Sequence, residues 1–175
     1  MKILFIHNKY AKFSGEEAVV ESQIKLLRDN GHQVITYFRC SEELEHMSNA
    51  KIKAFLSAFH NPNSVKEIKK ILEKEKPDLV HIHNLYPLIS PAILPAIKEK
   101  GIPIVMTVHN YRLLCPNGLF FSNGKICEKC TGAGKEINCI INNCEGSLFK
   151  STGYALRNFW ARTKKYYLGS GRKNK

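Results

Sequence analysis

The sequence predicts an α/β domain with a doubly wound, mostly parallel sheet, a cysteine-rich insertion and a C-terminal helix. Short apolar runs rich in β-branched residues occur at Met1–Ile6, Asp78–Ile82 and Ile104–Val108, as expected of strands buried on both faces. Amphipathic segments separate these runs, and such alternation is typical of a parallel sheet covered by helices. The regularity ends after His109, where a glycine- and cysteine-rich segment begins.

The elements between these strands follow from local signals. The first strand leads through a loop of small and polar residues into an amphipathic helix that begins near Gly15 and ends at Asn30. Gln33–Phe38 is the second predicted strand. Ser64–Lys76 is predicted to be a helix, because its apolar residues recur at helical spacing and Pro77 follows it.

Composition places the chain among ordinary globular proteins, with 175 residues, 43% hydrophobic and 24% charged. No apolar run approaches the roughly 20 residues that span a bilayer, and the N-terminal run is too short for a signal peptide. We therefore expect a cytoplasmic protein. The net charge is +12, with eight basic and no acidic residues from Lys150 to Lys175. This excess favours an anionic partner, such as a membrane surface, a nucleic acid or a phosphorylated substrate; a solubilising terminus is the alternative.

Three of the predicted strands lead into a loop through the dipeptide His-Asn. The pairs are His7-Asn8, His83-Asn84 and His109-Asn110. The carboxyl ends of parallel strands share one edge, where ligands bind in open α/β sheets, so these side chains are expected to converge. Imidazole and carboxamide groups offer donors and acceptors without fixed charge, which suits a polyhydroxyl ligand. A catalytic metal on the three histidines is a weaker alternative, because no carboxylate pattern accompanies them.

Two neighbouring features have less specific interpretations. His81 alternates with His83 and is expected to face the other way and support packing. Ser14 and Gly15 start the first helix, where a cap is the favoured interpretation and phosphate or sugar contact the alternative. The loop lacks the Gly-x-Gly-x-x-Gly fingerprint, so a dinucleotide-binding dehydrogenase is poorly supported.

Five of the six cysteines lie between residues 115 and 144. Cys127-x-x-Cys130 is a zinc-knuckle half-site, and Cys139 and Cys144 are close enough in sequence to complete it. We predict a structural zinc on these four thiolates, with Cys115 as a spare or a replacement; free buried thiols are the alternative. Four thiolates leave no open position, so the site is not predicted to be catalytic.

Residues 147–168 are predicted to form an amphipathic helix, and residues 169–175 a disordered tail. Leu148, Leu156, Phe159 and Trp160 fall roughly on one side of this helix, and cationic residues flank them. The pattern suits a helix lying on an anionic membrane. Packing of the same face on protein is the slightly favoured alternative.

These stretches together resemble the N-terminal domain of retaining glycosyltransferases of family four, in which two Rossmann-like domains face across a cleft. The resemblance covers residues 1 to about 167, and a cysteine pattern followed by Gly146-Ser147 resembles one subset of that family. The stretches that carry it are MKILFIHN, SGEEAVVESQIKLL with NGHQV, PDLVHIHN and IPIVMTVHNYRLLCPNG.

The resemblance implies the acceptor-binding half of an enzyme that transfers a sugar from a nucleotide-sugar donor to a glycan or lipid-linked acceptor. It assigns the catalytic-site role to His109, because the family's histidine after this strand lines the cleft near the transferred sugar. The family's double glycine appears here as Ser14-Gly15, and its paired glutamates and basic residues for the nucleotide-sugar have no counterpart. We therefore expect one domain over residues 1–168, with an insertion at 115–144, that lacks the donor-binding domain and is inactive alone.

Two other functions remain open at this point. One is a non-catalytic partner subunit of the same fold. The other is a zinc-stabilised nucleic-acid-binding module, which the net charge and the Cys-x-x-Cys pair favour. Against the second, basic and aromatic residues are not interleaved on a recognisable binding element, apart from the C-terminal helix.

Overall fold

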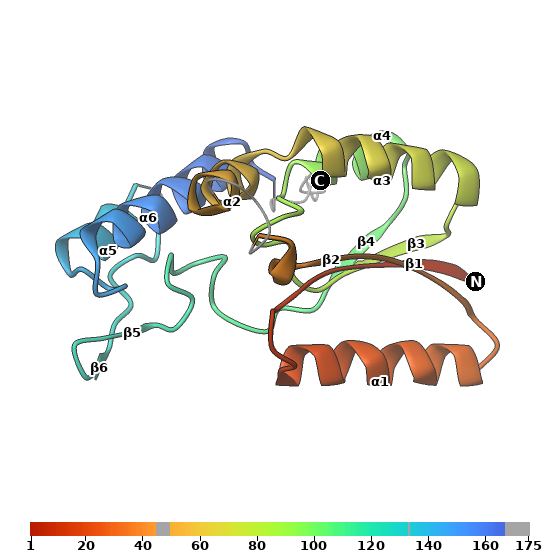
Figure 1. Cartoon of the computed structure of the whole chain (residues 1–175), viewed down its shortest axis with the longest axis horizontal. Helices are drawn as coiled ribbons and strands as arrows, with labels where there is room; N and C mark the ends of the chain where they lie inside the picture. Colours follow the sequence, from red (N-terminus) through yellow and green to blue (C-terminus); the bar gives the residue numbers. More distant parts are fainter. Residues whose placement is uncertain (45–49, 133, 167–175) are drawn as a thin grey trace, which may run out of the picture. The chain divides into compact units, whose positions relative to one another are not determined.

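The computed structural model describes residues 1–44, 50–132 and 134–166. The chain divides into two compact units, Met1–His109 and Asn110–Lys175. The first unit holds the parallel sheet, and the second holds the cysteine-rich segment and the C-terminal helix (Figure 1). The predicted single domain over residues 1–168 stays a prediction. The predicted tail, 169–175, lies outside the described residues.

The sheet of the first unit has four parallel strands in the order β2-β1-β3-β4. The strands are β1 (Lys2–Lys9), β2 (Gln33–Cys40), β3 (Leu79–Ile82) and β4 (Ile104–Met106). Helix α1 (Gly15–Asp29) covers one face, and α3 (Pro62–Glu75) and α4 (Ile93–Glu99) cover the other (Figure 1). This arrangement confirms the predicted mixed α/β fold with a parallel sheet.

The core of the first unit follows the period-two alternation of β1, which sends successive side chains to opposite faces. Ile3 and Phe5 pack with Val20 and Ile24 of α1. The helices on the other face also bury apolar side chains, which are Ile68, Leu72, Ile93 and Ile97. Between β2 and α3 the chain forms a short 3-10 helix, Ser41–Leu44, and α2 (Ala50–Phe59).

Two strands differ from prediction in ways that affect the site. Strand β1 continues to Lys9, so His7 and Asn8 lie within it and pair with β2 instead of following the strand. Strand β4 was predicted to be buried on both faces, but this is wrong: Val105 is 47% exposed. The reason is that β4 lies at the edge of the described sheet and pairs with β3 alone.

The second unit begins with a loop and a hairpin of β5 (Phe121–Ser122) and β6 (Lys125–Ile126). The hairpin turn is Asn123-Gly124, a dipeptide typical of such turns, and both residues adopt positive φ (52° and 75°). Two helices follow, α5 (Ile137–Ile141) and α6 (Leu148–Thr163). None of the helices in the described ranges is long and apolar enough to cross a bilayer.

Helix α6 is shorter than the predicted 147–168. It ends at Thr163, because Lys165 takes a left-handed φ of 52° and the N–H of Tyr166 bonds back to the carbonyl of Ala161. Such a left-handed residue satisfies the last carbonyls of a helix and stops it. Leu168 of the predicted helix lies outside the described residues.

Three polar side chains of α6 hold the loop that precedes the hairpin. Arg157 donates to the carbonyl of Pro116 (3.0 Å), and Asn158 donates to the carbonyl of Arg112 (2.7 Å). Arg162 donates to the carbonyl of Leu114 (2.6 Å) and forms an ion pair with the buried Glu136 (2.8 Å). Polar side chains on the buried side of α6 therefore fix the backbone of the loop at residues 112–116.

Candidate functional site

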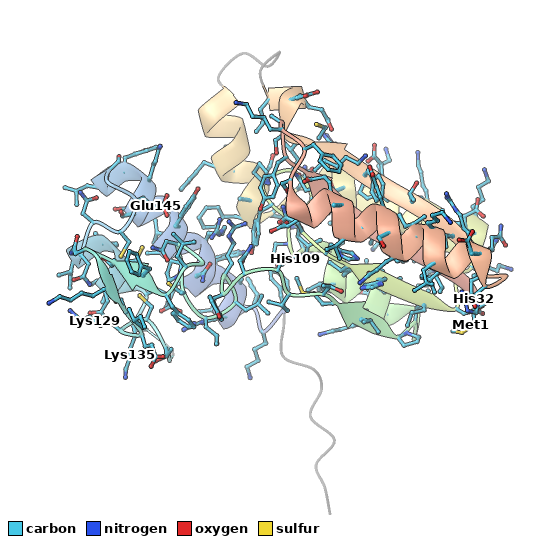
Figure 2. All side chains as sticks on the ribbon, turned by 90° about the horizontal axis from the view of Figure 1, so that it is seen from below. Met1, His32, His109, Lys129, Lys135 and Glu145 are labelled. Atoms are coloured by element: carbon cyan, nitrogen blue, oxygen red, sulfur yellow. The ribbon has the colours of Figure 1, made fainter. Side chains whose placement is uncertain are left out.

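The three histidines of the His-Asn dipeptides converge at the carboxyl edge of the sheet. His83 Nδ1 lies 2.8 Å from His109 Nε2, and these two rings stack with centroids 5.1 Å apart. His7 meets the His83 ring edge-on, with centroids 6.1 Å apart. Figure 2 shows His109 at the opposite end of the first unit from Met1 and His32. The sheet topology thus brings together His7, His83 and His109, as the strand-end argument predicted.

His81 belongs to the same cluster, so the prediction that it faces the other way is wrong. Its ring centroid lies 4.5 Å from that of His83, and its Nε2 lies 2.8 Å from the Thr107 hydroxyl. The physical reason is that residues two apart on a strand share a face. His81 and His83 both lie beside Phe5.

Burial favours the neutral form of His7, His81 and His83. It lowers the pKa of His83 to about 3, with help from the nearby charges of His81, His109 and His7 when these are protonated. Burial also lowers the pKa of His7, against the opposing effect of Glu17, and that of His81. A neutral imidazole has one donor and one acceptor nitrogen. Among the described residues, His7 Nδ1 and His83 Nε2 have no hydrogen-bond partner.

His109 and His81 are the half-buried members of this histidine cluster, while His7 and His83 are 0% and 3% exposed. Nε2 of His81 already meets the Thr107 hydroxyl, and His109 lies at the end of the cluster. The bond to His83 uses His109 Nε2 and fixes the plane of the ring, so Nδ1 of His109 is the nitrogen that can contact a ligand. The cluster therefore presents an oriented hydrogen-bonding group at this edge.

Glu17 is a site residue that the sequence reasoning missed. Its buried carboxylate accepts hydrogen bonds from the backbone N–H groups of Tyr10 (2.9 Å) and Ser14 (2.9 Å), and from the Ser14 hydroxyl. It also lies 3.4 Å from His7 Nε2. Burial alone would raise the pKa of Glu17, but these hydrogen bonds lower it to about 2. The available signal was the capping-box spacing of Ser14 and Glu17.

The start of α1 is therefore a filled cap. Ser14 accepts from the N–H of Glu16 (3.2 Å), and the capping box with Glu17 is complete, which confirms the cap interpretation of Ser14-Gly15. A helix N-terminus attracts anions through its free N–H groups and its dipole. Here a carboxylate of the chain already occupies that position. Contact of Ser14 or Gly15 with substrate stays a prediction.

The predicted asparagines of the first two dipeptides hold the backbone. Asn8 accepts from the N–H of Leu88 (2.9 Å) and donates to the Ser41 hydroxyl (3.1 Å). Asn84 donates to the carbonyl of Asn8 (3.0 Å) and accepts from the N–H of Tyr86 (3.1 Å). Both are buried, and these bonds favour a positioning role that ties the loop after β3 to β1.

Asn110 begins the second unit and shapes its first loop. Its side-chain oxygen accepts from the N–H of Arg112 (3.0 Å), and the loop is closed by a bond from the N–H of Tyr111 to the carbonyl of Gly118 (2.9 Å). Gly118 has φ +79°, and a Cβ there would lie 3.4 Å from Asn110. The predicted substrate contacts of Asn8, Asn84 and Asn110 stay predictions.

The predicted zinc ligands lie in the second unit as free thiols. Cys130 and Cys139 are buried against Ala155, and Cys144 packs on them. Burial and the neighbouring thiols raise the pKa of Cys130 to about 11, and the pKa of Cys139 is also raised. Among the described residues, no group of three or more histidine, cysteine, aspartate or glutamate side chains is arranged as metal ligands.

Comparison with known proteins identifies a protein family for the chain. A search of curated proteins finds no match to the chain. A model of the protein family described as Glycosyltransferase Family 4 matches residues 13–125, from the cap of α1 to the hairpin. The match spans more than half of the 175 residues and includes two of the three His-Asn dipeptides. On this evidence the chain belongs to glycosyltransferase family 4.

Proposed function

We propose that residues 1–175 form the acceptor-side half of a retaining glycosyltransferase, which transfers a sugar from a nucleotide-sugar donor to a glycan or lipid-linked acceptor. Family membership supports the transferase class. The observation that carries the proposal is the cluster of stacked imidazoles that ends at the half-buried His109. An oriented imidazole suits sugar hydroxyls, because its ring nitrogens can donate or accept hydrogen bonds.

In this proposal His109 acts by positioning. Its ring plane is fixed by the bond to His83, so its free nitrogen can hold one hydroxyl near the reacting centre. Burial keeps the pKa of His83 far below neutrality, which prevents a charge from building up behind His109. Orienting a reactant in this way removes entropy from the barrier before reaction.

Donor recognition is proposed to reside elsewhere in the enzyme. The diphosphate of a nucleotide-sugar needs cationic or N–H partners, and the helix start that could supply them holds the Glu17 carboxylate. A phosphate placed there would meet a like charge. We therefore propose that a separate donor-binding domain supplies the diphosphate site, and that residues 1–175 do not catalyse transfer by themselves.

Ring-nitrogen NMR of the histidines tests the proposal. We expect mono- and disaccharide probes at millimolar concentration to shift the His109 signals, and His109→Ala to abolish the saccharide response. His32→Ala is the matched control, because His32 lies at the opposite end of the first unit (Figure 2). UDP-glucose and GDP-mannose are expected to bind far more weakly than the low micromolar range, which corresponds to about 8 kcal/mol.

Two results would overturn it. Low micromolar binding of a nucleotide-sugar, or sugar transfer by residues 1–175, would place the donor site in these residues. A saccharide response unchanged by His109→Ala would remove the role of the cluster.

A non-catalytic partner subunit of the same fold is the second candidate. The Glu17 carboxylate in the cap of α1 favours this candidate, because a non-catalytic subunit needs no phosphate contact at the loop before α1. In that case no saccharide probe shifts the His109 signals, while the full cluster and its pKa values persist.

A further inference from the structure

The second unit has a core without large apolar side chains. Its buried apolar residues in the described ranges are Cys115, Cys130, Cys139, Ala155 and Ala161. By contrast, Leu119, Ile126 and Ile141 are 63%, 82% and 72% exposed. Burying a large apolar side chain contributes roughly 1.5–3 kcal/mol, and this unit gains little of it. Units of this size with small cores usually need disulfides, metal ions or a partner for stability.

The thiols occupy the centre of this small core. Cys130 and Cys139 pack together against Ala155 of α6, and Cys144 lies against them. They come from separate segments: Cys127 and Cys130 follow the hairpin, Cys139 lies in α5, and Cys144 lies between α5 and α6. A group that joined these thiols would therefore join the end of the hairpin, α5 and the segment that leads into α6.

Backbone hydrogen bonds already hold the thiols in two local pairs. The N–H of Cys127 bonds to the carbonyl of Phe120 (2.7 Å), and a turn closed by Thr131 and Glu128 (3.1 Å) carries Cys130. In the second pair, the N–H of Cys144 bonds to the carbonyl of Cys139 (3.1 Å). Two turn-held pairs of cysteines match the way that structural zinc sites are assembled.

A cationic side chain lies beside the cysteine segment. Arg162 donates to the carbonyls of Cys130 (3.4 Å) and Leu114 (2.6 Å) and also forms an ion pair with Glu136. Burial raises the pKa of the free thiols of Cys130 and Cys139, so the charge of a metal ion is needed to hold them as thiolates. Four thiolates with one divalent zinc carry a net charge of about −2, which a neighbouring guanidinium stabilises. Soft thiolate ligands select zinc among the common divalent ions of cells.

We propose that Cys127, Cys130, Cys139 and Cys144 together bind one structural zinc ion that serves as the core of the second unit. Cys115 stands outside the set: its thiol donates to the Asn117 side chain at 2.9 Å, a closer contact than the 3.6 Å between the Cys144 thiol and the Ser122 hydroxyl. Binding replaces four S–H bonds by four Zn–S bonds and releases four protons, without change of oxidation state. The thiols turn from their present packing to converge on the ion. This proposal is independent of the proposed transferase function.

Metal analysis of the purified chain tests it first. We expect about one zinc per chain, and about four thiols that react with a thiol reagent only after a chelator is added. Chelation is expected to lower the thermal midpoint of the second unit, which the fluorescence of Trp160 in α6 reports. Replacing zinc by cobalt is expected to give the visible absorption of a tetrahedral thiolate site, a readout that needs no variant.

Single substitutions then test the ligand set. Cys139→Ser and Cys127→Ser are expected to lose the zinc, and Cys115→Ser and the first-unit control Cys40→Ser to keep it. Metal-free folded protein with all thiols reactive would overturn the proposal. So would a disulfide among the four cysteines, zinc retained in Cys139→Ser, or zinc lost in Cys115→Ser. If Cys139→Ser fails to fold, the cobalt spectrum of the unmodified chain still decides.

Discussion

At the scale of single residues, the Glu17 carboxylate places a negative charge of the chain itself in the cap of α1. An empty helix N-terminus offers free N–H groups to an anion, but here the carboxylate accepts from Tyr10 and Ser14 in the cap loop and lies against His7. The same side chain links the cap to the histidine cluster. Glu17 therefore contacts His7 in the histidine cluster and completes the cap of α1.

We predict that Glu17→Gln lowers the free energy of unfolding at pH 7 by about 2 kcal/mol, because it removes charge-assisted hydrogen bonds from a buried cap. The folded-state pKa of Glu17 is about 2, below its ordinary value of 4.5, so its contribution is present above pH 4.5 and is lost as the pH falls toward 2. The difference between variant and parent should shrink over that range. Urea unfolding at several pH values measures it.

Glu21→Gln is the matched control for this prediction, since Glu21 is exposed on the same helix. Its effect should stay within about 0.5 kcal/mol. A Glu17→Gln deficit as large near pH 2 as at pH 7 would show that packing, and not the charge, supports the cap.

Convergence of the histidines could be predicted from the sequence, because parallel strands fix where their carboxyl ends lie. Glu17 was missed because the capping box places it on the helix, away from the strand ends where ligands were sought. The hydrogen bonds of Asn8 and Asn84 depend on the loop at residues 84–88, whose path no local pattern specifies.

At the scale of elements, α6 is held by polar contacts on one side. Arg162 reaches the carbonyls of Leu114 and Cys130 and pairs with Glu136, which is 3% exposed. Arg157 and Arg162 are two of the cationic residues near the apolar side of the predicted helix, and both bond inward to the second unit. A sequence pattern does not distinguish an arginine that faces lipid from one that caps loop carbonyls.

We predict that Arg162→Met destabilises the second unit by about 3 kcal/mol, because it leaves a buried carboxylate and several carbonyls without their cation. Urea unfolding followed by the single tryptophan, Trp160, measures this unit. Lys150→Met, at an exposed position of the same helix, is the control and should change little. Equal effects of the two substitutions would mean that the Arg162 contacts contribute nothing to stability.

The element boundaries show where local patterns stop being informative. The hairpin turn has a clear local signal, because Asn-Gly tolerates the positive φ of its two residues. The exposure of β4 was not predicted, because an apolar run looks the same on an edge strand as on a central one. The end of α6 was placed too late, because Lys165 has no side-chain feature that marks a left-handed residue.

At the scale of the whole molecule, charge is divided unequally between the units. Residues 1–109 contain 15 basic and 12 acidic residues, and residues 110–175 contain 12 basic and three acidic ones. The second unit also exposes apolar side chains along one side of α6: Leu148, Phe149, Leu156, Phe159 and Trp160 are 39% to 71% exposed. A cationic unit with exposed apolar side chains complements an anionic bilayer surface.

We predict that the protein associates peripherally with anionic membranes through this side of α6. Lys150 and Lys164 remain available as surface cations, the latter above the Trp160 ring at 4.8 Å, and each is worth roughly 1 kcal/mol near such a surface. The chain should co-sediment with phosphatidylserine vesicles and not with phosphatidylcholine vesicles, and high salt should release it. Trp160 emission should shift to the blue on binding, because the indole enters the interface.

Substitutions on exposed positions separate this contact from packing against protein. Leu156→Ser should weaken vesicle binding at least about tenfold, which corresponds to about 1.4 kcal/mol, since it removes apolar surface from the contact. Leu26→Ser, at a 61% exposed position of α1, is the control and should leave binding unchanged. If vesicles change neither sedimentation nor Trp160 emission, this side of α6 is instead a surface that packs on protein.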